Sequence, residues 1–350
     1  MSLFKGGYDF FALDIGTSSL RVVQLQGSEK TGWNLTGYGY ASVDPHVAQS
    51  SSEDGKRKLG EAIMTVIGQS GIKTKNVAIS LPANKTFTTV IEVPNQPLPE
   101  VQKLIKYQLD QYVPMAIDDA KVNWAVLGIS PRDGTKLEVL ISSVAKSYGE
   151  DRMELIEGLG LNVIAEEPDP VAMTRSLYPV GVPDARLIVD FGEASTDLVV
   201  TFDGAPRLVR SIPGGLMSLI KAASQNLGIK DDQARQFILK FGLAQDKLEG
   251  QVVRALESTL DNFAAELVKS IKFFQTKYTG VTVGGVLLSG FAGAIPMMSQ
   301  YVETKTSVQT TQGNPWQRVN VPKQYQDQLL PVAAEFAVVI GLAERNNLSD

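Results

Sequence analysis

The chain contains no cysteine and only one histidine, His46, among its 350 residues. The absence of cysteine excludes disulfides and thiolate chemistry, and it permits a reducing compartment. A single histidine removes most histidine-based metal sites and catalytic triads from consideration. The sequence also lacks a basic tract, and its net charge of −5 argues against nucleic acid as a partner, because phosphates attract a positive field.

Long apolar runs are absent as well. The opening "MSLFKGGYDF" has no sustained apolar segment of the kind found in a signal peptide, and the longest apolar stretches are interrupted before they reach a bilayer span. Hydrophobic residues make up 43% of the chain and charged residues 20%, as in soluble folded proteins. We therefore expect a cytoplasmic globular protein, and its length favours two lobes with separate cores.

The first part of the chain is typical of a sheet with one covering helix. Apolar runs separated by glycine-containing turns predict strands over 9–14, 19–26 and 33–42. Apolar residues at helical spacing predict a helix near 55–70, and a further strand follows at 77–82.

A different module begins near residue 85. The pattern predicts, in chain order, a strand at 86–93, a helix at 99–114, strands at 121–129 and 135–145, and a helix at 147–159. This β-α-β-β-α order is typical of a small α+β insert in a larger α/β protein.

The opening pattern then returns. "IVDFGEASTDLVVTFDG" (188–204) repeats the order of residue types in "LDIGTSSLRVVQLQG" (13–27). The matched pairs are Asp14 and Asp190, Gly16 and Gly192, and Ser19 and Ser195. The copies are too far apart for a solenoid repeat, so they indicate two homologous halves, each beginning with a β-hairpin. One later position differs, because Arg21 in the first copy corresponds to Asp197 in the second.

Each hairpin combines a carboxylate with groups that bind anions. Taken alone, such an Asp-x-Gly segment is equally consistent with an ordinary turn. Two copies favour a phosphate site, in which backbone amides and hydroxyls bind phosphate oxygens and the carboxylates hold Mg²⁺ through its waters. Arg21 would add a fixed positive charge beside the same phosphates.

Two glycine-rich segments follow the second hairpin. "IPGG" (212–215) precedes a predicted helix at 216–227, whose first amides could meet an anion, although a simple loop explains the motif equally well. "LLSGFAG" (287–293) ends a buried strand and would let backbone approach a flat ligand, or form only a tight turn. A strand at 306–311, a polar loop and an apolar helix at 331–345 complete the expected order.

In this order the chain resembles the PilM family, actin-like cytoplasmic proteins of type IV pilus assembly related to the cell-division protein FtsA. The segments that carry the resemblance are "LDIGTSSLRVVQL", "IKYQLDQYVP", "EEPDPVAM", "SIPGG", "LSGFAGAIPMM", "NPW" and "LLPVAAEFAVVIGLA". The resemblance implies an α/β fold of the actin and Hsp70 ATPase type with two lobes, each starting with a β-hairpin, and an α+β insert at the position called subdomain 1C.

The resemblance also implies domain boundaries. We expect a first lobe core over 1–84, the insert over 85–160, a return to the first lobe over 161–185, the second lobe over 186–328, and a C-terminal helix packed on the first lobe over 329–350.

The resemblance implies ATP or ADP with Mg²⁺ as cofactors. The metal-side carboxylates would be Asp14 and Asp190. The nucleotide contacts would be Gly16, Thr17, Ser18, Ser19 and Arg21 in the first hairpin, Gly192, Glu193, Ala194 and Ser195 in the second, Gly214 and Gly215 near the ribose, and Gly290, Phe291 and Ala292 around the adenosine. Glu167 is expected to face the nucleotide, and Gln236 is named from the candidates Gln233, Arg235 and Gln236. No residue is assigned to positioning an attacking water, so we expect nucleotide binding with weak or no hydrolysis.

The function implied is a scaffold that binds the N-terminal cytoplasmic peptide of the inner-membrane protein PilN and couples the inner-membrane platform to the pilus motor. Membrane association would come only through partners, at the inner face of the cytoplasmic membrane, and other platform and motor proteins are further candidate partners. Two alternatives stay open. A small-molecule kinase needs a base, for which Asp169 is the candidate although it is better explained as a turn residue. A division protein like FtsA needs a C-terminal amphipathic anchor, whereas this sequence ends "ERNNLSD" after an apolar helix.

Overall fold

The computed structural model describes residues 9–179 and 181–345, and these form two compact units. Of the described residues, unit 1 comprises 9–176, 315–329 and 336–345. Unit 2 comprises 177–179, 181–314 and 330–335. Each unit has its own sheet and its own hydrophobic core.

Unit 1 is built on a six-stranded sheet with the order β14-β3-β2-β1-β4-β8. Its strands are β1 (Phe11–Ile15), β2 (Ser19–Ser28), β3 (Gly32–Ser42), β4 (Asn76–Leu81), β8 (Asn162–Pro168) and β14 (Val319–Asn320). The first three strands pair antiparallel, whereas β4 is parallel to β1 and β8 is parallel to β4. The carboxyl ends of β1, β4 and β8 therefore meet at one edge of the sheet.

Helices cover the sheet of unit 1. They are α1 (Pro45–Ala48), α2 (Glu53–Ser70), α4 (Lys146–Gly158), α5 (Asp169–Leu177), α10 (Lys323–Leu329) and α11 (Ala337–Ala343). The bounds of α2 follow from its caps, because the Ser52 hydroxyl accepts the Gly55 N–H and Gly71 ends the helix in the left-handed conformation. All of β1 is buried, because helices cover both of its faces. Leu13 packs with α2, and the alternate residue Ala12 is also fully buried, in a strand that contacts α11.

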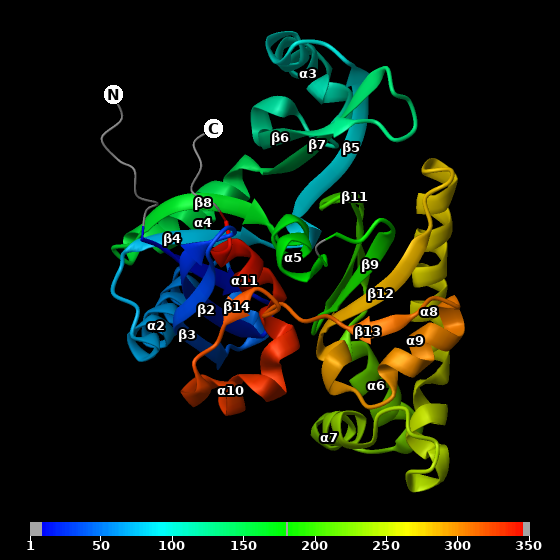
Figure 1. Cartoon of the computed structure of the whole chain (residues 1–350). Coiled ribbons are helices and arrows are strands. Elements are labelled where there is room, and N and C mark those ends of the chain that lie inside the picture. The colour runs from blue at the N-terminus through cyan, green and yellow to red at the C-terminus, as the bar shows by residue number, and fades with distance from the viewer. Residues whose placement is uncertain (1–8, 180, 346–350) are drawn as a thin grey trace. The chain divides into compact units, whose positions relative to one another are not determined.

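The predicted insert forms a three-stranded antiparallel sheet with the order β5-β7-β6. Its elements are β5 (Thr86–Pro94), α3 (Leu98–Tyr112), β6 (Ala120–Ile129) and β7 (Lys136–Ala145). Helix α3 packs on this sheet through Val101 and Ile105 in a core of its own (Figure 1). The boundary at 160 differs, because Ile156 of α4 is buried in the core beneath the six-stranded sheet rather than in the core of the insert.

Unit 2 repeats the architecture of unit 1. Its five strands have the order β11-β10-β9-β12-β13, with an antiparallel β9-β10-β11 meander and β12 and β13 parallel to β9. The strands are β9 (Ala185–Phe191), β10 (Ser195–Phe202), β11 (Ala205–Pro213), β12 (Val283–Gly290) and β13 (Thr310–Gln312), and the helices are α6 (Leu216–Leu227), α7 (Asp231–Phe241), α8 (Gln251–Lys277) and α9 (Met298–Thr306). The order matches β3-β2-β1-β4-β8 of unit 1 strand for strand.

The C-terminal part of the sequence holds the main differences from expectation. The strand predicted at 306–311 is shorter, because α9 extends to Thr306 and β13 begins at Thr310. Residues 315–328, assigned to the second lobe, belong to unit 1, since Val319 of β14 pairs with Trp33 of β3. Residues 177–185, assigned to the first lobe, begin unit 2.

The last apolar segment is a core element. The helix predicted at 331–345 is a 3-10 turn over Leu330–Phe336 followed by α11, all of whose residues are buried. Residues 323–343 are long and apolar enough to span a membrane by composition, yet burial of α11 against β1 accounts for this composition.

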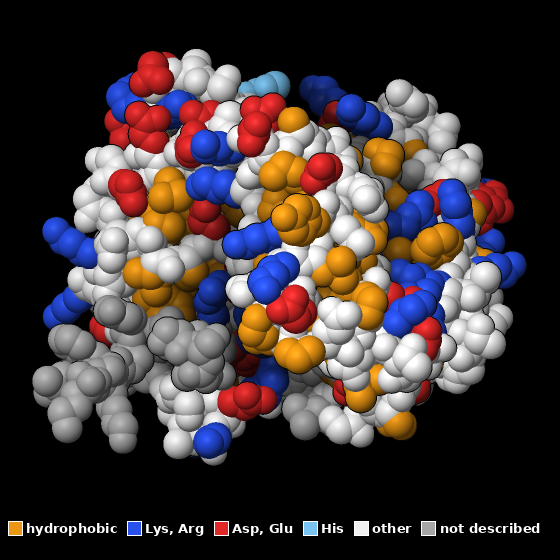
Figure 2. Space-filling model, turned by 90° about the horizontal axis from the view of Figure 1, so that it is seen from above, with side chains coloured by type: hydrophobic (Ala, Val, Ile, Leu, Met, Phe, Trp, Pro, Cys, Tyr) orange, Lys and Arg blue, Asp and Glu red, His pale blue; other side chains and the backbone are white. Residues whose placement is uncertain are grey.

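On the face shown in Figure 2, Lys and Arg side chains are interspersed with Asp, Glu and hydrophobic side chains.

Candidate functional site

The two hairpins end in turns of the same construction. In the first turn (residues 16–19) the Gly16 N–H donates to the Ser19 carbonyl at 2.9 Å, and in the second turn (residues 192–195) the Gly192 N–H donates to the Ser195 carbonyl at 3.0 Å. A Cβ atom on Gly16 would lie 3.1 Å from the Ser19 oxygen, and one on Gly192 would lie 2.8 Å from the Ser195 oxygen. A Cβ at Gly192 would force the Ser195 backbone to shift, whereas at Gly16 the space is only tight. The amides of both glycines bond within the turns rather than facing a phosphate.

Asp14 lies at the end of β1 and is almost completely buried. The Ser80 hydroxyl on β4 donates to Asp14 Oδ1 at 2.8 Å, and Arg21 Nη1, opposite Asp14 on β2, donates to Oδ2 at 3.3 Å. Arg21 therefore neutralises the Asp14 carboxylate, in addition to any phosphate contact. A metal held at Asp14 would share this carboxylate with two protein donors.

The matching pair in unit 2 consists of two carboxylates. Asp197 on β10 lies opposite Asp190 on β9, and Asp197 Oδ1 is buried without a hydrogen-bond partner among the residues that the structure describes. The pKa of Asp197 is raised to about 7, mainly by burial; a hydrogen bond from Ser211 opposes the shift, and the nearby Asp190 charge adds to it. Two adjacent carboxylates suit either a shared proton or a cation that also binds water and phosphate oxygens.

Gly290 brings a third segment beside Asp190. It ends β12 next to β9 and has a φ of 63°, in the left-handed region. A Cβ on Gly290 would lie 2.6 Å from the Phe191 carbonyl oxygen and 2.9 Å from Asp190 Oδ1, so a larger residue would displace the carboxylate. Phe291 and Ala292, predicted around the adenosine, follow directly in a short 3-10 turn.

The second turn is connected to α7 and to this 3-10 turn through Arg235. Arg235 Nη1 lies 2.7 Å from Glu193 Oε1 and Nη2 lies 3.3 Å from Oε2, which makes a two-pronged ion pair. The same guanidinium lies 5.5 Å from the centroid of the Phe291 ring, as in a cation–π contact. Of the candidates on this helix, Arg235 rather than Gln236 therefore joins the predicted residues Glu193 and Phe291.

The "IPGG" segment holds the second turn in place. The amides of Leu216 and Met217 in the first turn of α6 donate to the carbonyls of Gly192 and Glu193 at 3.0 and 2.9 Å. A Cβ on Gly215 would lie 2.3 Å from the Gly192 oxygen. Because these helix amides already bond to the turn, the segment positions residues 192–195 instead of offering the Leu216 and Met217 amides to an anion.

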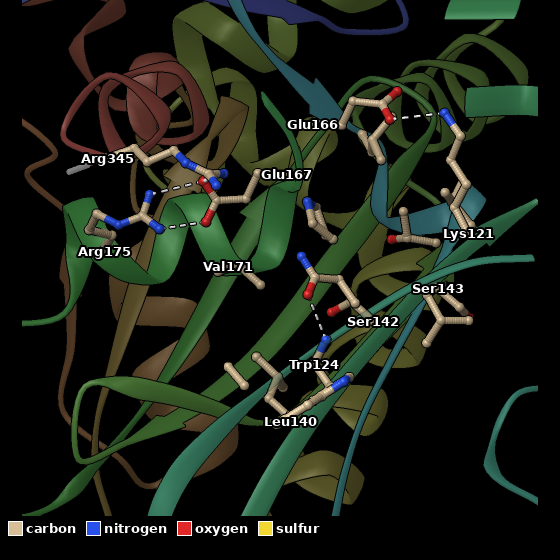
Figure 3. Close-up of a pocket in the computed structure, with 17 residues that line it drawn as sticks. Lys121, Trp124, Leu140, Ser142, Ser143, Glu166, Glu167, Val171, Arg175 and Arg345 are labelled. Carbon is tan, nitrogen blue, oxygen red and sulfur yellow. Dashed lines mark hydrogen bonds and ion pairs between the residues drawn. The ribbon is translucent and has the colours of Figure 1, made fainter. Parts of the chain in front are cut away.

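Glu167 is separated from the first turn. It ends β8, and its carboxylate is held by Arg175 of α5 through both oxygens, with Arg345 Nη1 3.6 Å from Oε2 (Figure 3). Glu167 lines a cavity of about 720 Å³, whereas Gly16 and Thr17 line a different one of about 330 Å³. The expectation that Glu167 faces a nucleotide is not supported by these contacts, because both of its oxygens are already paired.

The larger cavity, which we name the edge cavity, is lined by residues of two outer strands and of β7. It is lined by residues 121–125 of β6, residues 140 and 142–144 of β7, residues 166–168 of β8 and Val171 of α5 (Figure 3). β6 is an outer strand of the three-stranded sheet, and β8 is an outer strand of the six-stranded sheet. Outer strands carry backbone N–H and C=O groups that no neighbouring strand pairs, so the walls suit an extended peptide.

The described part of the chain has no site that could hold a metal ion through protein ligands alone. Over residues 9–179 and 181–345, no three His, Asp or Glu side chains are grouped so that they could hold a metal ion. Mg²⁺ tolerates this arrangement, because it commonly binds one or two carboxylates and completes its shell with water and phosphate. The carboxylates at Asp14 and at Asp190 with Asp197 fit such a cation only together with phosphate oxygens.

Comparison with known proteins identifies the family. The family model described as "Type IV pilus assembly protein PilM" matches residues 12–347. The chain belongs to the PilM family. A solved structure entitled "PilM-PilN type IV pilus biogenesis complex" aligns with a TM-score of 0.80 at 20% identity, over 97% of this chain and 98% of that one.

More distant structures share the fold of this PilM-family chain. The ethanolamine utilization protein EutJ from Carboxydothermus hydrogenoformans aligns with a TM-score of 0.57 at 13% identity, covering 98% of this chain and 91% of its own. MreB5 of Spiroplasma citri, solved bound to ADP, aligns with a TM-score of 0.51 at 11% identity, covering 95% and 94%. At these identities the likeness concerns the fold, which is the actin-like ATPase fold predicted from the sequence.

Family membership confirms the resemblance and places the protein in type IV pilus assembly. It does not favour the kinase or the FtsA-like alternative, and Asp169, the candidate kinase base, is the first residue of α5.

Sequence reasoning missed Ser80 and the lining of the edge cavity. The signals available were a serine near the end of a parallel strand and the paired Glu166 and Glu167 at the end of another.

Proposed function

We propose that this PilM-family protein is a cytoplasmic scaffold that binds the N-terminal cytoplasmic peptide of PilN as an extended segment in the edge cavity. The observation that carries the proposal is that two outer strands, β6 and β8, line one cavity. The similar structure entitled a PilM–PilN complex supports PilN as the partner. Bound in this way, the protein would lie at the inner face of the cytoplasmic membrane and couple the inner-membrane platform to the pilus motor.

Peptide addition to a strand edge explains why the cavity needs few special side chains. The main chain of the peptide would bond to the free edge of β6, which supplies affinity, while alternate side chains would enter the space toward Val171 and Leu140. The cavity volume of about 720 Å³ accommodates several residues of an extended segment.

Ligand titration tests this proposal directly. A synthetic PilN N-terminal peptide is titrated into the full-length protein and into Ala125→Arg, which places a long side chain on the exposed wall of β6. We expect the variant to lose most of the binding. Ala265→Arg, at an exposed alanine of α8 outside the cavity, serves as the matched control and should bind like the unmodified protein. Equal binding by Ala125→Arg would exclude the edge cavity as the site.

We further propose that the actin-like fold binds ATP or ADP with Mg²⁺, using the turn of each unit for phosphate. The phosphates would be contacted by Thr17, Ser18, Ser19 and Arg21 in unit 1 and by Glu193, Ala194 and Ser195 in unit 2. Asp14 and Asp190 would bind Mg²⁺ through water. Phe291 and Ala292 would border the adenosine. The proposal rests on the identical construction of the two turns and on the unpaired buried Asp197 oxygen beside Asp190. Slow or absent hydrolysis is expected, since no side chain is assigned to orient water.

Calorimetric titration of ATP·Mg²⁺ tests the second proposal. Asp14→Asn and Asp190→Asn should each weaken binding, whereas Asp327→Asn, an exposed carboxylate of α10, should not. Unchanged affinity in both site variants would remove these carboxylates from the nucleotide site.

A further inference from the structure

The edge cavity contains two polar atoms without a hydrogen-bond partner among the residues that the structure describes. Glu166 Oε1 and Ser143 Oγ are both shielded from solvent, and both residues line the cavity. Ser143 is 2% exposed. An unpaired buried polar group costs about 1–3 kcal/mol, so such atoms indicate where a ligand supplies the missing bond.

Glu166 is fixed in position by its other oxygen. Lys121 Nζ of β6 lies 3.2 Å from Glu166 Oε2 (Figure 3). The same ammonium lies 3.2 Å from Met153 Sδ. This ion pair joins the outer strand of the insert to the outer strand of the six-stranded sheet. Glu166 is thereby held among the residues that line the edge cavity, with Oε2 paired and Oε1 unpaired.

Both carboxylates that line the edge cavity are paired with cations. Glu166 pairs with Lys121, while Glu167 pairs with Arg175 and Arg345, so the lining carries three cations and two anions. A cationic group of a ligand would meet this positive excess at short range. A neutral N–H donor satisfies Glu166 Oε1 without adding charge to a partly buried site.

We propose, given the peptide site above, that Glu166 is a specificity-determining residue that accepts one neutral N–H of the bound peptide. The donor is either a backbone amide that points away from β6, as alternate amides of an extended strand do, or a side-chain amide. A segment that supplies a donor at this position removes the cost of the unpaired carboxylate oxygen, whereas a segment without one leaves that cost in place, which selects for the donor.

A double-mutant cycle with the full-length protein tests the proposal. The probe is the synthetic PilN N-terminal peptide, prepared also as an alanine scan and as a scan of single N-methylated amides. Because a hydrogen bond to a charged group contributes about 1.5–3 kcal/mol, Glu166→Leu should weaken binding by roughly 10- to 100-fold. A change at one peptide position should weaken binding to the unmodified protein. The same change should have little further effect on the affinity of Glu166→Leu.

Two further variants separate hydrogen bonding from positioning of the insert. Glu166→Gln keeps an acceptor but loses the ion pair, and Lys121→Met removes the ion pair but keeps Glu166. Both should retain binding within about fivefold, since a partly exposed ion pair contributes little. If Lys121→Met lost as much affinity as Glu166→Leu, the pair would only position the insert, and the proposal would be wrong.

The outcomes distinguish this proposal from the peptide site on which it rests. Failure of the unmodified protein to bind the peptide would overturn the peptide site itself. Binding that is equal in Glu166→Leu, or coupling only at a lysine or arginine of the peptide, would overturn the role of Glu166 and leave the site standing. Coupling in the alanine scan identifies a side-chain donor, and coupling in the N-methyl scan identifies a backbone donor.

Discussion

Asp197 lies directly opposite Asp190 across strands β9 and β10, whereas the corresponding position in unit 1 pairs Arg21 with Asp14. The two halves share strand order and turn construction but differ in the charge beside the strand-end carboxylate. In unit 1 the carboxylate is neutralised within the protein by Arg21. In unit 2 the opposite side chain, Asp197, is a second carboxyl whose pKa is raised to about 7, mainly by burial, so unit 2 is the half whose stability should respond to pH.

Replacement of Asp197 should change how stability depends on pH. The folded protein holds the Asp197 proton up to a pKa of about 7, against 3.8 for an ordinary aspartate, so this carboxyl favours folding below about pH 4 and that contribution is lost as the pH rises through 7. The free energy of unfolding of Asp197→Asn, relative to that of the unmodified protein, should therefore be higher at pH 8 than at pH 4 by roughly 2–4 kcal/mol. Urea unfolding in EDTA across this range measures the difference.

Glu257→Gln, at an exposed carboxylate of α8 in the same unit, is the control for this experiment. Its stability relative to the unmodified protein should change little with pH. If Asp197→Asn followed the same flat profile, the carboxyl would not be held protonated by burial.

Arg235 should matter more to nucleotide binding than its neighbour Gln236. Arg235→Lys keeps the charge but loses the two-pronged contact with Glu193 and the stacking on Phe291, which loosens both segments. We expect about a tenfold loss of ATP affinity, on the scale of one charged hydrogen bond. Gln236→Ala should bind nearly as tightly as the unmodified protein, and calorimetry with ATP·Mg²⁺ measures both. A larger loss for Gln236→Ala would reverse the assignment.

Gly215→Ala should destabilise unit 2 because the added Cβ would lie 2.3 Å from the Gly192 carbonyl oxygen. This clash is relieved only if the second turn or the start of α6 moves, which should lower the free energy of unfolding by about 2–4 kcal/mol. Gly68→Ala in α2 is the opposite case, since a Cβ there meets no atom within 4 Å, and it should stabilise by about 0.5–1 kcal/mol. Unfolding midpoints of the two variants should therefore shift in opposite directions.

Elements with strong periodicity could be predicted from the sequence because their own residues decide them. The strands of the first hairpin and α6 lie within two residues of the expected ranges. The helix α5 was missed because Asp169 and Pro170 were interpreted as a turn, although aspartate followed by proline is also a helix start. β14 could not be predicted, since it exists only through pairing of two residues with β3.

The candidate site was predicted in part for the same reason. Local sequence indicates the turns, because glycine and aspartate there serve nearby backbone. It does not indicate partners that come from distant segments, such as Ser80 for Asp14, Arg235 for Glu193, or Arg175 and Arg345 for Glu167. Those pairings depend on which strands and helices become neighbours, so they required the structure.

Hydrogen exchange with and without the PilN N-terminal peptide tests the central claim most directly. If the peptide adds to the strand edge in the edge cavity, amides of β6 and of the β8–α5 segment should exchange more slowly in the complex, while α8 in unit 2 stays unchanged. Protection confined to other elements, with β6 and β8 exchanging as in the free protein, would contradict the account.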